Sequence, residues 1–172
     1  MSTKQTLDEL VKAAVIELFQ ARGVTVSASQ QADGVAEYAA VIGFSGHEMR
    51  GMLGLGMAKT TLEELSGSRA RGADIFDAED WLRESSNQLL GRLKKKLLRL
   101  SVIIDLALPT VLAGDRLRLL ASTSAGPWAY GFACPAGKLT AWLAVRLAPG
   151  VELIETDDPE LQGANEGDLV LF

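Results

Sequence analysis

Residues 80–100, with the sequence DWLRESSNQLLGRLKKKLLRL, are the stretch that decides the expected fold. The leucines in it recur at the spacing of an α-helix. Leu89, Leu93, Leu97 and Leu100 fall within about 60° of Leu82 around the helix axis, and Leu90 lies at about 80°. The stripe they form predicts a face that packs on the protein core. We expect the helix to run from about residue 78 to residue 100, with Asp77 as its N-terminal cap.

The opposite face of this predicted helix is polar. Asp80, Glu84, Asn87 and Gly91 lie between about 140° and 200° from Leu82, so they are expected to face solvent. Glu84 and Asn87 are neighbours one turn apart. A glycine within a helix costs about 1 kcal/mol relative to alanine, and nothing on a solvated face offsets that cost. A partner whose backbone approaches closely would explain Gly91, although a polar face is usually only solvated.

The segments before this helix predict a helix, a hairpin and a second, short helix. Thr6 and Glu9 have the spacing of a capping box for a first helix over residues 4–21. A short strand is expected at residues 24–29, and strands 38–44 and 49–57 form a hairpin around a turn at 45–47. The short helix covers residues 59–65 and is followed by a loop through Gly72.

The segments after the long helix predict strands. Four candidates, separated by turns rich in Pro, Gly and Ser, cover residues 102–108, 116–121, 128–134 and 139–147. Helices on one side and a run of short strands on the other indicate an α+β fold, with helices packed on a largely antiparallel sheet.

Charge is unevenly distributed along the 172 residues. Residues 151–172 hold seven acids and no Lys or Arg, so the other 150 residues carry a formal charge of only +2. This balance lacks the basic excess that nucleic-acid binding needs. We expect a domain at 1–150 with an acidic C-terminal extension at 151–172. Without a membrane-length apolar run or a secretory signal, the expected location is the cytoplasm and no membrane partner is expected.

Few residues offer conventional catalytic or metal chemistry. His47 and Cys134 are the only histidine and the only cysteine. No motif places a catalytic partner beside His47, and one cysteine cannot form a metal cluster. We expect His47 to be a turn residue, Cys134 to be an inert thiol and the chain to bind no metal of its own.

Three blocks resemble the CheC/CheX/FliY family of chemotaxis phosphatases. Glu84-x-x-Asn87, followed by an apolar pair, Gly91 and basic residues, is similar to the signature helix of that family. Residues 41–46 with Arg50 and Gly51 resemble its first hairpin, and residues 108–114 resemble the Pro-Thr-Val segment that follows the signature helix. The blocks have the same order as in the family and cover about residues 7–147. The resemblance implies a CheC/CheX-like fold.

The resemblance also implies a function. A CheX-like enzyme hydrolyses the aspartyl phosphate of a phosphorylated CheY-type response regulator. By similarity, Asn87 would orient the attacking water and Glu84 would pair with a lysine of the regulator. Asp80, Gly91, Lys94 and Lys95 would contribute to the surface that binds it. Mg²⁺ would be supplied by the partner, and CheX-like members imply a homodimer.

Two classes of function remain open. One is the phosphatase, and the alternative is a non-catalytic module that binds a response regulator in a signalling or flagellar assembly. CheC-like members carry a second Glu-x-x-Asn on the first helix, where this chain has only Glu17 and Gln20. We therefore expect a single site.

Overall fold

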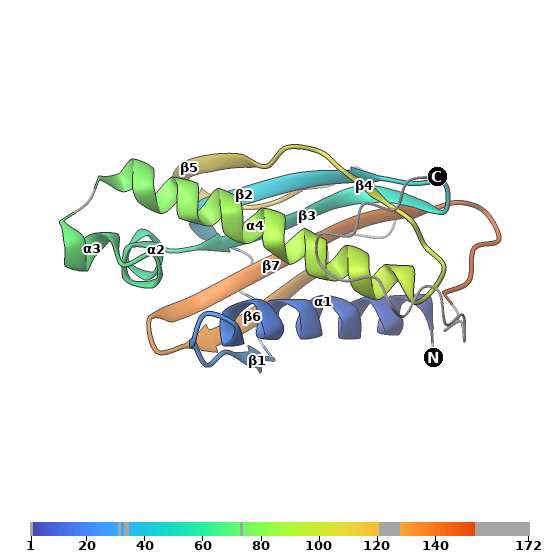
Figure 1. The fold of residues 1–172 in the computed structure, drawn as a ribbon, viewed down its shortest axis with the longest axis horizontal. Helices are drawn as coiled ribbons and strands as arrows, with labels where there is room; N and C mark the ends of the chain where they lie inside the picture. The colour runs from blue at the N-terminus through green and yellow to red at the C-terminus, as the bar shows by residue number, and fades with distance from the viewer. Residues whose placement is uncertain (1, 31, 33–34, 73, 121–127, 154–172) are drawn as a thin grey trace.

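The computed structural model describes residues 2–30, 32, 35–72, 74–120 and 128–153. Within these residues the chain forms one seven-stranded sheet with helices along one face, as Figure 1 shows. The strands follow the order β1-β6-β7-β3-β2-β4, and β5 also pairs with β2. All of the described strand pairs are antiparallel. The predicted α+β class and the antiparallel sheet are confirmed.

The elements have the following bounds in chain order. The helices are α1 (Thr3–Gln20), α2 (Lys59–Leu65), α3 (Ser68–Arg71) and α4 (Ile75–Leu98), and the strands are β1 (Ser27–Ser29), β2 (Ala36–Ser45), β3 (Met49–Met57), β4 (Asp105–Leu106), β5 (Thr110–Leu117), β6 (Trp128–Cys134) and β7 (Gly137–Leu147).

The β2–β3 hairpin lies at the centre of the sheet. Its register runs from Tyr38 opposite Met57 to Ser45 opposite Arg50. β7 pairs along the other edge of β3, from Met49 opposite Leu147 onward. Because side chains alternate along a strand, every second residue of these strands enters the helix-side core. The predicted hairpin is confirmed.

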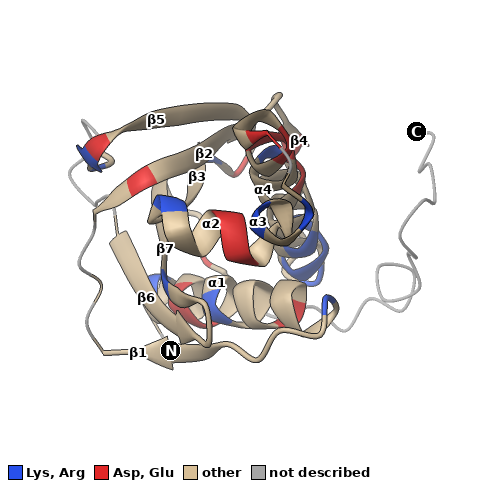
Figure 2. Ribbon diagram, turned by 90° about the vertical axis from the view of Figure 1, so that its left-hand side faces the viewer, with Lys and Arg blue, Asp and Glu red and all other residues tan. Residues whose placement is uncertain are grey.

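Helices α1 and α4 lie side by side on the sheet and run in opposite directions (Figure 1). Figure 2 looks nearly along them and shows the sheet curving around both. The apolar stripe of α1 is buried with that of α4 in one core. Lys96 of α4 also donates to Glu17 of α1 at 2.6 Å. The leucine stripe that the sequence predicts therefore packs as expected.

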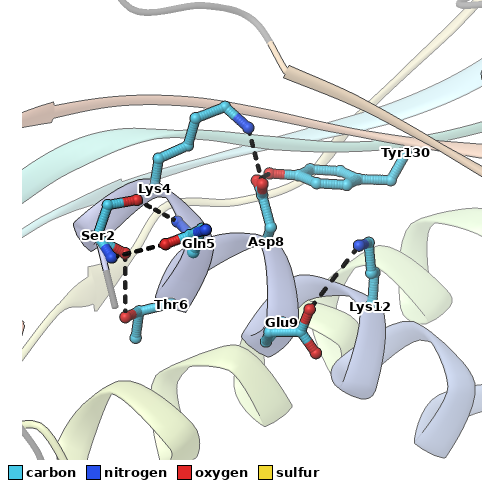
Figure 3. Close-up of polar contacts among 8 residues, drawn as sticks. All are labelled: Ser2, Lys4, Gln5, Thr6, Asp8, Glu9, Lys12 and Tyr130. Atoms are coloured by element: carbon cyan, nitrogen blue, oxygen red, sulfur yellow. Dashed lines mark hydrogen bonds and ion pairs between the residues drawn. The ribbon is translucent and has the colours of Figure 1, made fainter.

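A polar contact ties the N-terminal half of α1 to the sheet, as Figure 3 shows. Tyr130 Oη of β6 donates to Asp8 at 2.7 Å, and Lys4 pairs with the same carboxylate at 2.7 Å. The Lys4 ammonium also lies 5.2 Å from the centre of the Trp128 ring. Burial and the bond to Asp8 raise the pKa of Tyr130, so the phenol stays neutral.

Both predicted helix caps lie about one turn after the observed ones, although α1 begins at Thr3, within one residue of its predicted start. The capping box of α1 is formed by Ser2 and Gln5, whose side chains each accept from the backbone N–H of the other, and not by Thr6 and Glu9. α4 begins at Ile75 with Asp74 at the cap position, which places Asp77 in the first helical turn. A carboxylate is favourable both at the cap position and in the first turn of a helix, because the positive end of the helix dipole attracts it. Residue type alone therefore does not show whether Asp74 or Asp77 is the cap of α4. Residues 68–71, predicted as loop, form the short α3.

The strand predicted at residues 116–121 is wrong, because β5 lies earlier and ends at Leu117. Gly114, taken in the prediction as part of a turn, lies inside this strand. The pairing of β5 with β2 shifts register between Ala36 and Tyr38, and Arg116 has a positive φ of 55°. A bulge uses the same residue types as a turn, so the sequence pattern does not distinguish them. The strand expected over 102–108 is reduced to β4.

Two further expectations concern the acidic C-terminal extension and membrane-spanning segments. Residues 154–172, most of the predicted acidic extension, lie outside the described residues. No described helix is long and apolar enough to cross a membrane.

On the face away from the helices, Trp142 lies flat on the sheet. It is 2% exposed and packs with Ala36, Ala39, Leu117 and Leu119. Glycine in β3 makes this possible, because a Cβ at Gly56 would lie 2.5 Å from two ring atoms of Trp142 and 2.8 Å from Ala36. The ring thus replaces the side chain that β3 lacks there.

We expect Gly56→Ala to lower the free energy of unfolding by about 1–3 kcal/mol, because neither the ring nor Ala36 can move away without disturbing the sheet. Urea unfolding measures the change. The matched control is Gly91→Ala in α4, where a Cβ would meet nothing within 4 Å and a gain of about 1 kcal/mol is expected. A Gly56→Ala protein as stable as wild type would contradict this account of Trp142.

Candidate functional site

The polar face of α4 points away from the core, as the helical spacing predicts. Leu82, Leu89 and Leu93 are buried, whereas Asp80, Glu84, Asn87 and Gly91 are all exposed. Because an α-helix rises about 1.5 Å per residue, the face from Asp80 to Lys95 extends over about 22 Å. The packing of α4 therefore places the predicted site residues on one continuous, outward surface.

Glu84 and Asn87 differ in their contacts. Glu84 Oε1 accepts a hydrogen bond from Gln88 Nε2 at 2.8 Å. Within the described part of the chain, no hydrogen bond engages the Asn87 carboxamide or Oε2 of Glu84. The Asn87 amide thus keeps both a donor and an acceptor available to a molecule that approaches the helix.

The other predicted contact residues surround this pair. Asp80 forms an ion pair with Arg83 one turn away on the same helix. Gly91 leaves open space on the exposed face. Lys95 is exposed and Lys94 is half-buried, and neither forms an ion pair with another described residue. Of the three consecutive lysines, only Lys96 forms an ion pair with another described residue, Glu17.

Arg22, which follows the end of α1, reaches across to α4 beside Glu84. Its guanidinium donates to Ser85 Oγ at 2.5 Å and to Gln88 Oε1 at 3.0 Å. Its Cζ lies 4.8 Å from the centre of the Trp81 ring, within the range of a cation–π contact. Arg22 is therefore connected to Glu84 through the Gln88 amide.

The charge environment of Arg22 is mixed. Burial lowers the pKa of the Arg22 guanidinium, and the positive charge of Arg92 lowers that pKa further, whereas Glu84 acts in the opposite direction. An arginine remains protonated at physiological pH in spite of such a shift. A half-buried cation thus lies close to Glu84 without forming a direct ion pair with it.

Three residues of this surface were not anticipated. Arg22 and Gln88 form the contacts described above, and Phe76, which is 67% exposed, lies about 20° from Asn87 around the helix axis. The four-residue spacing of Glu84 and Gln88 is visible in the sequence and could have indicated their contact. Nothing in the local sequence around Arg22 indicates that it reaches α4.

The described residues offer no alternative site of conventional chemistry. No three His, Cys, Asp or Glu side chains among them come close enough to hold a metal ion. His47 is exposed in the turn between β2 and β3, and Cys134 is half-buried at the end of β6.

A surface hollow of about 570 Å³ lies between α1, β1 and β6, and a second one of about 320 Å³ lies near β6 and β7; no residue of α4 lines either of them. Small ligands usually bind in concave pockets. Neither of these hollows includes the face of α4 that carries Glu84 and Asn87.

Solved structures share this fold. The CheX chemotaxis protein of Vibrio vulnificus superposes with a TM-score of 0.73 at 14% identity, over 81% of this chain and 96% of that chain. A CheC-like protein of a Shewanella species gives a TM-score of 0.70 at 14% identity, over 85% and 99% of the two chains. A CheX–CheY–BeF₃–Mg²⁺ complex from Borrelia burgdorferi gives 0.56 at 14% identity, over 83% and 96%.

At the level of sequence, no curated protein matches the chain. The family model described as chemotaxis phosphatase CheX matches residues 38–133, which include all but the first two residues of the β2–β3 hairpin and the whole of α4. This match covers more than half of the 172 residues. The chain belongs to the CheX family of chemotaxis phosphatases.

Proposed function

We propose that this protein hydrolyses the aspartyl phosphate of a phosphorylated CheY-type response regulator. The observation that carries the proposal is the free carboxamide of Asn87 beside Glu84 on the exposed face of α4 in a chain of this family. A second support is the Borrelia burgdorferi relative, which was crystallised with CheY, BeF₃ and Mg²⁺. BeF₃ is a mimic of a phosphoryl group, so the CheY of that complex carries a stand-in for the phosphorylated state.

Asn87 is assigned to the attacking water. Its amide oxygen accepts a hydrogen bond from the water and aligns the oxygen with the phosphorus. The P–O bond to the aspartyl carboxylate breaks as the water oxygen bonds to phosphorus, which yields inorganic phosphate and the free aspartate. An acyl phosphate is already activated, so positioning supplies most of the catalysis. This explains how a site without a nucleophile of its own can act.

Glu84 is assigned to a lysine of the regulator. The side chain is exposed, and no described hydrogen bond engages its second carboxylate oxygen, which can therefore accept that ammonium. Mg²⁺, which would be held by the partner's own carboxylates, neutralises charge on the phosphoryl group. We place no metal ligand on this chain.

The rest of the polar face is assigned to docking. Gly91 lets the partner's backbone approach the helix, and Asp80, Lys94 and Lys95 contribute charges at the two ends of the site. Phe76 extends the surface with an apolar side chain, which suits the mixed composition of protein interfaces.

The alternative is a non-catalytic module that binds a response regulator through the same face. The two are separated by the lifetime of phosphorylated CheY-type regulators of the same organism, each loaded with a small-molecule phosphodonor and Mg²⁺. A lifetime shortened by catalytic amounts of this protein supports the phosphatase. Binding of every such regulator without any shortening would leave only the binding module.

Asn87→Ala and Glu84→Ala should have different kinetic effects. Asn87 acts mainly in the transition state, so its loss should lower kcat by roughly 100-fold and leave KM near the wild-type value. Glu84 acts in docking, so its loss should lower kcat/KM by about tenfold with a raised KM. Both side chains are exposed, so stability should change by less than about 0.5 kcal/mol. Full activity of Asn87→Ala would refute the assigned mechanism.

Gly91→Gln tests close approach of the partner. Glutamine is a far better helix former than glycine, so the variant should be more stable by a few tenths of a kcal/mol to about 1 kcal/mol. Its side chain adds bulk to the docking face, so binding of the regulator, measured by titration calorimetry, should weaken. Unchanged affinity would show that the partner does not approach the helix at this position.

We also propose that the protein forms a homodimer. β1 and β4 end the principal strand order of the described sheet, and both are short. A strand at an edge has unpaired backbone groups that a second copy can use. Sedimentation equilibrium at tens of micromolar should give twice the monomer mass, and a value near 18.3 kDa would exclude the dimer.

A further inference from the structure

We propose that Arg22 and Gln88 are positioning residues that hold the Glu84 carboxylate ready for its partner. The proposal rests on the docking role assigned to Glu84 above. It concerns a relay of three side chains, in which Arg22 donates to Gln88 and Gln88 donates to Glu84.

The chemistry of the relay permits one orientation of the Gln88 amide. A guanidinium has only donors, and a carboxylate has only acceptors. The amide oxygen must therefore face Arg22, at 3.0 Å, and the amide nitrogen must face Glu84, at 2.8 Å. An amide turned the other way would set donor against donor and acceptor against acceptor. The charge of Arg22 thus fixes how Gln88 holds Glu84.

Arg22 is itself held firmly. Ser85, which is fully buried, accepts from the guanidinium at 2.5 Å and donates to the Trp81 carbonyl at 2.6 Å. The Trp81 ring lies under the guanidinium, 4.8 Å from ring centre to Cζ. These contacts anchor one end of the relay in the α1–α4 junction, where side-chain motion is restricted.

The amide between the two charges preserves the function of Glu84. A direct ion pair with Arg22 would occupy the carboxylate and lower its attraction for a partner lysine. Gln88 engages Oε1 alone and transmits the position of Arg22 without neutralising Glu84. A carboxylate that is already ordered loses less side-chain entropy when it binds, so docking is tighter.

The first experiment measures steady-state kinetics of the full chain with a phosphorylated CheY-type regulator. Gln88→Met keeps the length and helix propensity of the side chain and removes both hydrogen bonds. We expect KM to rise about fivefold while kcat stays within about twofold of wild type. In a Glu84→Ala background the same substitution should have no further effect, because the relay then has nothing to position.

Lys96→Gln is the matched control. It removes the other polar tie between α1 and α4, the ion pair with Glu17, and has no described contact with Glu84. Its KM should equal that of wild type. A purely structural role of Gln88 would raise KM equally with and without Glu84, and that result, or an unchanged KM in Gln88→Met, would overturn the proposal.

The second experiment needs no partner and separates this proposal from the proposed function. The side-chain ¹⁵N amide signal of Gln88 is followed by NMR in the free protein. Arg22→Gln and Glu84→Ala should each shift that signal, whereas Lys96→Gln should leave it in place. A signal unmoved by Arg22→Gln overturns the relay even in an active enzyme. Failure of wild type to shorten the phosphoryl lifetime refutes the phosphatase, and the NMR result still decides the relay.

Discussion

Leu82, Leu89 and Leu93 of α4 are buried against the sheet and α1, and this contact fixes the orientation of the whole helix. Each fully buried leucine contributes about 1.5–3 kcal/mol relative to an exposed one, so rotation of the helix about its axis would be costly. Because the helix turns about 100° per residue, burial of the leucines forces Glu84 and Asn87 to the outside. The site is thus positioned by hydrophobic packing on the opposite face, and its own polar residues contribute little to that placement.

Helix α1 and the residues that follow it contact individual polar side chains of α4. The apolar stripe of α1 shares the core with α4, and Glu17 and Arg22 bind α4 at two points. Tyr130 and Asp8 fix the other half of α1 to β6. Arg22 in turn donates to Gln88, the residue that donates to Glu84. The contacts of the half-buried Arg22 with Ser85, Gln88 and the Trp81 ring leave its side chain few other conformations.

Gly56 and Gly91 are glycines for different reasons. Gly56 is required by packing, since Trp142 occupies the space of a side chain there. Gly91 has open space around it and no internal reason to be glycine. From the sequence, Gly91 is interpreted as a position where a partner's backbone could approach the helix. The open space at Gly91 leaves room for such an approach, whereas packing inside the fold accounts for Gly56.

The sequence alone determined the elements whose patterns are long and periodic. The stripe from Leu82 to Leu97, the hairpin of β2 and β3 and the outward position of Glu84 and Asn87 all follow from side-chain spacing, which local geometry enforces. The two helix caps, the start of α4 and the bulged β5 were placed incorrectly, because caps and bulges use residue types that are equally suitable one turn away. Only the tertiary structure brought Arg22 to Gln88, 66 positions along the chain. Such a contact depends on the packing of two helices against one sheet, and spacing within either helix carries no information about it.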